Sequence, residues 1–379
     1  MKKIAVVTGT RAEYGLLKPV MQRMKEDKEI ELVLITCGMH YDKNFGYTIN
    51  QIINDGFQPS IELNTYPLQD TLFDYAQFFA LISKSLAENL INHEITAALV
   101  LGDRVEILAV TSIFILYKIP VLHLHGGEIS GNIDNIFRNA ITKMAHYHFP
   151  STQNHAKRII KMGEESDRVE VIGSLGYNQA KKFMDGEIEY ESDIELPTRP
   201  YFVILMHPES EFEKITEQMG IIYNTIKNIN MNLIIIDPNS DPGGRTIQNI
   251  YDNWKINNIK IQRYKSVNQL TFFHILKNSE FLIGNSSSGM IEAHALRIPV
   301  INIGSRQAGR DSGGNVISVN WDENELKDLI NKILHDFNYK QNLINSESPF
   351  YKKDPEQLII EKIKTIKFSD DFFNKRMTY

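Results

Sequence analysis

Short apolar runs alternate with segments of helical periodicity along most of this chain of 379 residues. Such runs are typical of strands buried on both faces of a parallel sheet, and the intervening segments supply the helices that cover those faces. In the first part of the chain we expect strands at Ile4–Thr8, Leu32–Thr36, Ala97–Leu101 and Pro120–His125, with helices at about 14–26, 70–92, 104–117 and 133–145. The alternation predicts a doubly wound α/β domain.

A second series follows a polar, acidic stretch from Asp185 to Pro200, which we interpret as the passage between two domains. A run at Val169–Gly173 precedes this stretch, and strands are expected after it at 201–206, 232–237, 258–263, 281–283 and 300–303. We predict two Rossmann-like domains, 1–172 and 173–354, with a C-terminal segment, 355–379, that packs back on the first. The carboxyl ends of the two sheets would then face one cleft, where α/β sheets bind ligands.

Composition and charge exclude several classes of protein. The net charge of −6 and the absence of a Lys/Arg block argue against a nucleic-acid surface. Cys37 is the only cysteine, so one chain can form neither a disulfide nor a cysteine-based zinc site. No apolar stretch is long enough to span a membrane, and the N-terminus lacks the features of a signal peptide. We therefore expect a cytoplasmic protein.

The stretch Gly284–Glu292 has the pattern of a strand end, a turn of small polar residues and a helix start. Free backbone N–H groups and the helix dipole make such a turn a binding site for a diphosphate. Ser286 and Ser287 add hydroxyl donors there, and Glu292, one turn inside a helix expected at Met290–Leu296, can accept from the hydroxyls of a ribose. The alternative is an ordinary serine cap followed by an exposed glutamate.

Two turns of the first domain carry charged side chains at the ends of expected strands. Arg11 follows the first strand at the mouth of a helix, where an arginine suits a phosphate, although a surface arginine is the plainer interpretation. Asp103 and Arg104 follow a glycine at the end of the strand 97–101, and Arg104 is a candidate to bind the UDP-sugar. A carboxylate at this edge of the sheet is costly unless it is paired or used, and Asp103 can also serve as a helix cap.

The densest cluster of titratable groups lies between His123 and Asp134. His123 and His125 alternate along an expected strand and should point to one face, while Glu128 and Asp134 flank the opening of a helix. Imidazole and carboxyl groups together suit acid–base chemistry at a sugar carbon. A metal site is the competing interpretation, but the spacing does not match a histidine-rich helix motif.

Polar turns also end the strands of the second domain. His207 precedes a proline, which favours an extended backbone and directs its ring out of the strand end. Asn239 lies in a loop rich in turn residues and can bind a polar group of a ligand. Arg306 and Arg310 follow the strand 300–303 and offer two cations to a diphosphate.

Taken together, these motifs resemble the UDP-N-acetylglucosamine 2-epimerases, and among them the hydrolysing branch that makes N-acetylmannosamine for sialic-acid-type sugars. The resemblance spans most of the chain from Thr8 to Arg310 and rests on Thr8-Gly-Thr-Arg-Ala-Glu, Gly102-Asp-Arg104, His125-Gly-Gly-Glu-Ile-Ser-Gly131, Ile141-Thr-Lys-Met-Ala-His-Tyr-His148, His207-Pro208, Pro238-Asn-Ser-Asp241, Gly284-Asn-Ser-Ser287 and Asn302-Ile-Gly-Ser-Arg-Gln307. It implies a GT-B architecture in which the second domain holds most of the nucleotide.

The resemblance also implies a mechanism and roles for residues. Loss of the C2 proton and of UDP would give a 2-acetamidoglycal, and water would add with the opposite configuration at C2. Arg11, Ser286 and Ser287 would hold phosphate, Glu292 would hold ribose, and three residues would act in catalysis or sugar binding: Asp103, Asp134 and His207. The family implies no metal, no cofactor and a homo-oligomer, either a dimer or a tetramer.

One position departs from the family pattern. Many members have a glutamate where this chain has His125, and here a carboxylate appears three residues later as Glu128, so the sequence leaves open which of the two transfers protons. The stretch Gly38–Asp42 lacks the Gln-His-Arg element of the non-hydrolysing branch, so we expect no allosteric nucleotide-sugar site. Three alternatives remain open: the same chemistry on UDP-2,4-diacetamido-2,4,6-trideoxy-glucose of the legionaminic acid pathway, a GT-B glycosyltransferase, and a non-catalytic sensor.

Overall fold

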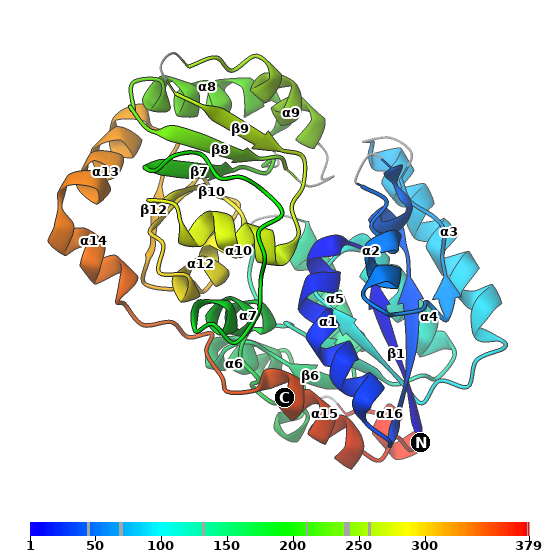
Figure 1. Cartoon of the computed structure of the whole chain (residues 1–379). Helices are drawn as coiled ribbons and strands as arrows, with labels where there is room; N and C mark the ends of the chain where they lie inside the picture. The colour runs from blue at the N-terminus through cyan, green and yellow to red at the C-terminus, as the bar shows by residue number, and fades with distance from the viewer. Residues whose placement is uncertain are drawn as a thin grey trace. The chain divides into compact units, whose positions relative to one another are not determined.

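The computed structural model describes residues 1–43, 46–67, 71–130, 133–209, 211–238, 243–256, 259–376 and 378. The chain divides into two compact units. Unit 1 comprises Met1–Glu128, Ile133–Leu175 and Lys352–Tyr379, and unit 2 comprises Ile129–Asn132 and Gly176–Tyr351. Each unit contains a six-stranded sheet flanked by helices (Figure 1), which confirms the predicted α/β class with two Rossmann-like parts, the GT-B architecture.

Unit 1 has the strand order β3-β2-β1-β4-β5-β6, and its paired strands are all parallel. The strands are β1 (Lys2–Thr8), β2 (Ile30–Thr36), β3 (Ile61–Glu62), β4 (Ala97–Leu101), β5 (Val121–Leu124) and β6 (Tyr147–Phe149). The helices are α1 (Arg11–Glu26), α2 (Ile49–Asn54), α3 (Leu72–Leu90), α4 (Val105–Leu116), α5 (Asp134–Met144), α6 (Gln153–Lys161), α15 (Pro355–Thr365) and α16 (Asp370–Phe373).

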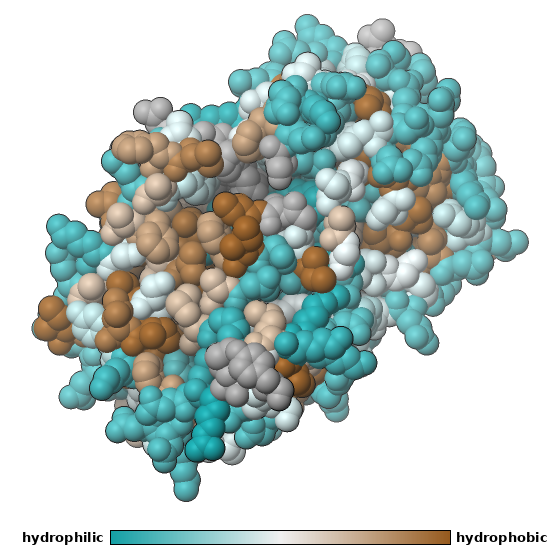
Figure 2. Space-filling model, turned by 180° about the vertical axis from the view of Figure 1, so that it is seen from behind, coloured by the Kyte–Doolittle hydropathy of each residue, from teal (hydrophilic) through white to brown (hydrophobic). Residues whose placement is uncertain are grey.

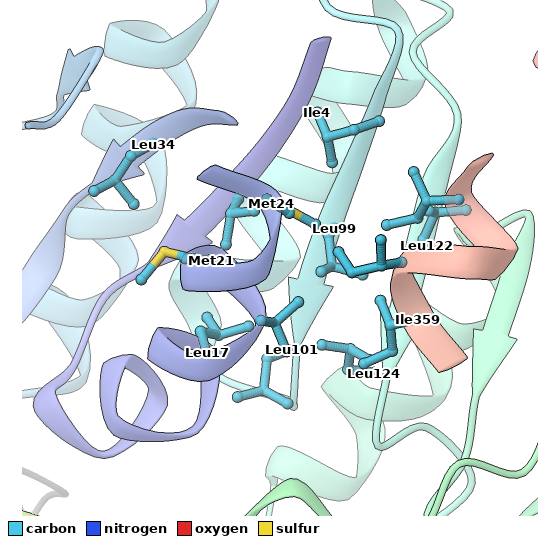
Figure 3. Packing of buried hydrophobic residues seen from close by; sticks show 14 of the residues in the cluster. Ile4, Leu17, Met21, Met24, Leu34, Leu99, Leu101, Leu122, Leu124 and Ile359 are labelled. Carbon is cyan, nitrogen blue, oxygen red and sulfur yellow. The ribbon is translucent and has the colours of Figure 1, made fainter. Parts of the chain in front are cut away.

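The period of two along each buried strand sends side chains to both faces of the sheet. Ile4 and Val6 of β1 join a core with α1 and α15, while Ala5 and Val7 join a second core with α3, α4 and α5. Figure 3 shows the first of these cores, in which side chains of α1 and Ile359 of α15 lie against the strands. Burial of each such side chain stabilises the unit by about 1.5–3 kcal/mol.

The C-terminal segment belongs to this core. Helices α1 and α15 lie side by side (Figure 1). Lys2 donates from Nζ to the carbonyl groups of Ile363, Lys364 and Ile366 at 2.7–2.9 Å. These carbonyls end α15 and have no partner within the helix, so the Lys2 cation caps its C-terminus.

Unit 2 has the strand order β12-β11-β10-β7-β8-β9, again with parallel pairs. Its strands are β7 (Tyr201–Leu205), β8 (Asn232–Ile236), β9 (Ile261–Tyr264), β10 (Leu282–Gly284), β11 (Val300–Ile303) and β12 (Val316–Val319). Its helices are α7 (Leu175–Met184), α8 (Ile215–Ile226), α9 (Gly244–Asp252), α10 (Gln269–Lys277), α11 (Ser287–Met290), α12 (Glu292–Ala295), α13 (Glu323–His335) and α14 (Phe337–Ile344).

The two sheets have the same topology. Counted from the first strand of each unit, the order is 3-2-1-4-5-6 in both. The order reverses between β1 and β4 in unit 1 and between β7 and β10 in unit 2. Ligands of open α/β sheets bind beyond the carboxyl ends of the strands at such a switch point.

The run Val169–Gly173 forms only an isolated bridge, His148 to Val169, and no named strand. One local expectation was wrong. The helix expected at Met290–Leu296 is two four-residue helices, α11 and α12. The short edge strands β3 and β12 were not anticipated. In the part of the chain that the structure describes, no helix has the length and apolar character needed to cross a membrane.

Candidate active site

A buried arginine organises the carboxylates of unit 1. Arg138 lies on α5, is 2% exposed and forms an ion pair with Asp103, which follows β4. One of its guanidinium nitrogens donates to the carbonyl of Glu128 at 3.2 Å and to the side-chain oxygen of Asn135 at 3.4 Å. An arginine buried this deeply must be paired with acceptors of opposite charge.

Three carboxylates, those of Asp103, Glu128 and Asp134, affect the pKa of Arg138. Burial alone would lower the pKa of Arg138, but the negative charges of Asp103 and Glu128, and to a lesser degree Asp134, outweigh burial and raise it. Three of the predicted catalytic side chains therefore lie around one cation in unit 1. Arg138 itself was not among the predicted site residues, although its place one helical turn after Asp134 was a usable signal.

His123 holds the turn that carries Asp103. Its ring Nε2 lies 2.8 Å from the carbonyl oxygen of Gly102, and Nδ1 lies 3.2 Å from the hydroxyl of Thr142. Burial lowers the pKa of His123 to about 3, so the ring is neutral. Nε2–H then donates to Gly102, and this histidine ties the end of β5 to the turn after β4.

The position of His125 corrects the expected strand pattern. β5 ends at Leu124, and His125 has a φ of +61°, in the left-handed region that few residues other than glycine adopt. Its side chain therefore does not continue the alternation with His123. The ring Nε2 of His125 accepts the backbone N–H of Leu175 at 3.4 Å, and only 7% of the residue is exposed.

The two cations predicted for unit 1 occupy helix starts. Arg11 is the first residue of α1, and its burial lowers its pKa. Arg104, rather than Asp103, is the N-cap residue of α4, and its Nε lies 3.0 Å from a carboxylate oxygen of Glu106. Arg104 is thus engaged with a buried carboxylate in the same turn, which was not anticipated from the sequence.

At the switch point of unit 2, an amide side chain joins two of the turns. The backbone N–H of His207 donates to the side-chain oxygen of Asn285 at 2.8 Å, and the side-chain nitrogen of Asn285 donates to the carbonyl of His207 at 2.9 Å. These bonds join the turn after β7 to the turn after β10. His207 is half-buried at the end of its strand, where the sequence placed it.

The turn after β10, Asn285–Ser288, is called the serine turn below. It has a serine cap, but the single helix expected after it is absent. Ser286 caps α11 and its hydroxyl accepts the N–H of Ser288 at 3.4 Å, while Ser287 begins the helix. Glu292 begins the separate helix α12, so it does not share one continuous helix face with the serines. Glu292 is only 9% exposed, which rules out the alternative of a surface glutamate.

Both predicted arginines of unit 2 lie on the turn after β11. Arg306 donates to the carbonyl of Asn285 at 3.3 Å, so it reaches back to the serine turn, and Arg310 donates to the side chain of Gln307 at 3.0 Å. Asn239 lies outside the described residues. Among the residues that are described, no group of three or more His, Cys, Asp or Glu side chains is arranged to hold a metal ion.

A protein-family model described as UDP-N-acetylglucosamine 2-epimerase matches residues 22–364. The chain belongs to the UDP-N-acetylglucosamine 2-epimerase family. It is 34% identical over 375 residues to the Escherichia coli polysialic acid biosynthesis protein P7, a match that covers 97% of this chain and 94% of the relative. It is 33% identical over 328 residues to a UDP-N,N'-diacetylbacillosamine 2-epimerase (hydrolyzing) of Legionella pneumophila, covering 84% and 85%.

Solved structures of such epimerases share the fold. The crystal structure of UDP-GlcNAc 2-epimerase from Neisseria meningitidis bound to UDP-GlcNAc matches with a TM-score of 0.78, covering 97% of this chain and 100% of that one. Sequence identity in that alignment is 19%, so the likeness supports the architecture of this epimerase and not the details of its site.

Proposed function

We propose that this epimerase is of the hydrolysing type and converts UDP-N-acetylglucosamine to N-acetylmannosamine and UDP, a reaction that serves sialic acid synthesis. The observation that carries the proposal is the group of three carboxylates around Arg138 in a member of this family. Relatives of the chain bear names that include the word hydrolyzing, which also favours loss of UDP. The reaction needs no metal and no redox cofactor.

The chemistry divides into an elimination and a hydration. A base removes the C2 proton while the bond between C1 and the UDP oxygen breaks, which gives a 2-acetamidoglycal and UDP. Water then adds across the double bond, its hydroxyl to C1 and a proton to the opposite face of C2. Asp103, Asp134 and either Glu128 or His125 are the groups of unit 1 that we assign to these proton transfers, and His207 is a further candidate from unit 2.

Unit 2 is assigned to the nucleotide. Backbone N–H groups at the serine turn, the hydroxyls of Ser286 and Ser287, and the cations of Arg306 and Arg310 suit a diphosphate and would stabilise it as a leaving group. Glu292 is assigned to the ribose hydroxyls. Arg11 of unit 1 is assigned to phosphate, as the family resemblance implies, and Arg104 is assigned to the UDP-sugar.

A second candidate substrate is UDP-2,4-diacetamido-2,4,6-trideoxy-glucose. It is favoured by the relatives named for UDP-N,N'-diacetylbacillosamine in Legionella pneumophila and for its GDP or UDP form in Campylobacter jejuni. The reaction at C1 and C2 would be the same, and only the groups facing C4 and C6 would differ.

Incubation of the purified protein with each UDP-sugar, followed by identification of the products, tests the proposal. We expect free 2-epimerised sugar and UDP in equal amounts, with a higher kcat/KM for one substrate. In heavy water the product should carry deuterium at C2. Retention of the substrate's protium at C2 would contradict elimination, and activity that appears only when a sugar acceptor is added would indicate a glycosyltransferase.

We also propose that the chain is a homo-oligomer and that the outer surface of α3, α4 and α5 contributes to its interface. These helices pack side by side on one face of the unit 1 sheet. They expose Leu81, Leu116 and Ile136 by 50%, 76% and 67%, and Figure 2 shows hydrophobic side chains gathered on this side of unit 1. Leu116→Glu should lower the mass measured by sedimentation, and an unchanged mass would contradict this interface.

A further inference from the structure

Asn285 is buried completely and uses all of its polar groups to join three turns of unit 2. Its side-chain oxygen accepts the backbone N–H of His207 at 2.8 Å, and its side-chain nitrogen donates to the backbone carbonyl of His207 at 2.9 Å. Its carbonyl accepts from Gln307 at 2.7 Å and from Arg306 at 3.3 Å, and its N–H donates to Leu205 at 3.4 Å. One residue of the serine turn therefore contacts the turns after β7 and β11.

The strands beside Asn285 approach each other unusually closely. A Cβ on Gly284 would lie 2.1 Å from the carbonyl oxygen of Leu205, so only glycine fits at the end of β10. This close approach brings the amide of Asn285 within reach of the His207 backbone. A buried amide in this position must keep both hydrogen bonds, because a buried polar group without a partner costs about 1–3 kcal/mol.

Glu209 makes a second connection between the outer two of these turns. One of its carboxylate oxygens accepts the backbone N–H groups of Ser305 and Arg306 at 2.7 and 2.8 Å. The other accepts the indole N–H of Trp321 at 3.1 Å. Because Glu209 already joins the turn after β7 to the turn after β11, the Asn285 side chain is not needed to hold those two turns together. Its separate task is to fix the backbone of His207.

We propose that Asn285 is a positioning residue that sets the backbone, and through it the ring, of His207 against the substrate, while its main chain orients Arg306 for the diphosphate. The inference rests on the proposed function in one respect, namely that His207 acts on the sugar. It assigns two separable roles to one residue: the side chain governs turnover and the main chain governs nucleotide binding.

Asn285→Asp tests the role of the side chain with little change in shape. The carboxylate can still accept the N–H of His207, but its second oxygen would face the His207 carbonyl and repel it. We expect kcat to fall about 10- to 100-fold, as for a catalytic group displaced by a fraction of an ångström to an ångström. The Kd for UDP should rise as well, because a carboxylate next to Ser286 repels a diphosphate, so the role of the side chain is read from kcat at saturating UDP-sugar.

Asn315→Asp is the matched control. Asn315 is also fully buried in unit 2 and donates from its side chain to a backbone carbonyl, that of Ile298, at 2.6 Å. Its own carbonyl accepts the N–H of Val300 at the amino end of β11, which is the opposite edge of the sheet. This variant should lower the melting temperature and leave kcat and the Kd for UDP unchanged.

The His207 ring signal, followed by NMR of histidine-labelled protein and assigned with His207→Gln, gives a readout that does not depend on activity. We expect the signal to move in Asn285→Asp and to stay in place in Asn315→Asp. An unmoved signal, or equal losses of kcat in both variants, would overturn the inference. If wild-type protein turned over no UDP-sugar, the proposed function would fail, while a shifted His207 signal would still support the connection to Asn285.

Discussion

The two switch points have the same strand topology and opposite chemistry. In unit 1, two buried glutamates, Glu13 and Glu106, lie against Gly9 at the end of β1: Glu13 accepts the N–H of Gly9 at 2.8 Å, and a Cβ on Gly9 would lie 2.8 Å from a Glu106 oxygen. In unit 2, the same place in the sheet holds the neutral amide of Asn285 and the hydroxyl of Ser286, with Arg306 beside them.

Under the proposed function, this difference would let one fold, used twice, perform two tasks. A phosphate would be repelled by carboxylates and is attracted by N–H groups, hydroxyls and arginines, so the unit 2 switch point suits a diphosphate. Proton transfer needs side chains that can accept and return a proton, and carboxylates are groups of this kind. Topology fixes where a ligand can bind, and the side chains at the strand ends determine which part of the ligand binds there.

The largest expected effect comes from removing the negative charges of unit 1 one at a time, which tests their assignment to proton transfer. Asp103→Asn and Asp134→Asn should each lower kcat by about 10²- to 10⁴-fold, since each removes a group that accepts or returns a proton. The Kd for UDP, measured by calorimetry, should change little, because Asp103 and Asp134 are assigned to proton transfer and not to the diphosphate.

Asp55→Asn is the control for these two variants. Asp55 accepts from Tyr14 at 2.7 Å and pairs with Lys18 in the same unit, away from the strand ends. Its substitution should leave kcat unchanged. Full turnover in Asp134→Asn would remove that residue from the site.

The complementary test removes a cation from unit 2. Arg306→Ala should weaken UDP binding by about 10- to 100-fold, the range expected when a hydrogen bond to a charged group is lost. Arg199→Ala is the matched control, because Arg199 is exposed and precedes β7 at the amino edge of the same sheet. Equal affinity for UDP in both variants would place the diphosphate elsewhere.

Much of this comparison was predictable from the sequence, because strand ends are marked by local composition. The runs that form β1, β4, β7 and β10 are apolar, and the polar turns after them carry Asp103, His207 and Ser286. Parallel topology then places those turns along one edge of each sheet. Short-range patterns of this kind fix the fold class and the candidate residues.

The interactions across strands were not predictable in the same way. The pairing of Arg138 with Asp103 joins residues 35 positions apart, and the bonds between Asn285 and His207 join residues 78 positions apart. The break between α11 and α12 and the left-handed backbone of His125 are also tertiary effects. Hydrophobic periodicity carries no information about which polar groups meet after folding.

Glu292→Ala tests whether Glu292 of unit 2 binds the ribose or takes part in the chemistry. Loss of a carboxylate that accepts ribose hydroxyls should raise KM about 10-fold with kcat within about 2-fold, because the bond is made equally in the ground and transition states. Glu280→Ala is a suitable control, since Glu280 pairs with Lys340 and precedes β10 at the amino edge. A fall in kcat with KM unchanged would instead assign Glu292 to the chemistry.

The last prediction concerns the proton held by Glu13 in unit 1. Burial, followed by the negative charge of Glu106, raises the pKa of Glu13 to about 8. One oxygen of each carboxylate, Oε1 of Glu13 and Oε2 of Glu106, has no hydrogen-bond partner among the described residues. Because its raised pKa lies above 7, we expect Glu13 to be neutral at pH 7.

A raised pKa in the folded state makes stability fall as pH rises. Glu13 is protonated in both states below its ordinary pKa of 4.5 and ionised in both above about 8, so the loss is confined to the window between these values. Within it, the free energy of unfolding should fall by up to about 1.4 kcal/mol per pH unit. Glu13→Gln keeps the acceptor for Gly9 and removes the titration, so urea unfolding at pH 5.5, 7 and 8.5 should show the variant gaining stability relative to wild type as pH rises.

Glu164→Gln provides a control of opposite sign in the same unit. Burial alone would raise the pKa of Glu164, but hydrogen bonds from His148, Lys143 and Lys375 outweigh it and lower the pKa to about 2. Its stabilising contribution is lost only as pH falls from its ordinary pKa of 4.5 to about 2, so the deficit of Glu164→Gln should be constant from pH 5.5 to 8.5. If the difference between wild type and Glu13→Gln were equally constant, Glu13 would not change its protonation between pH 5.5 and 8.5, which would contradict the raised pKa.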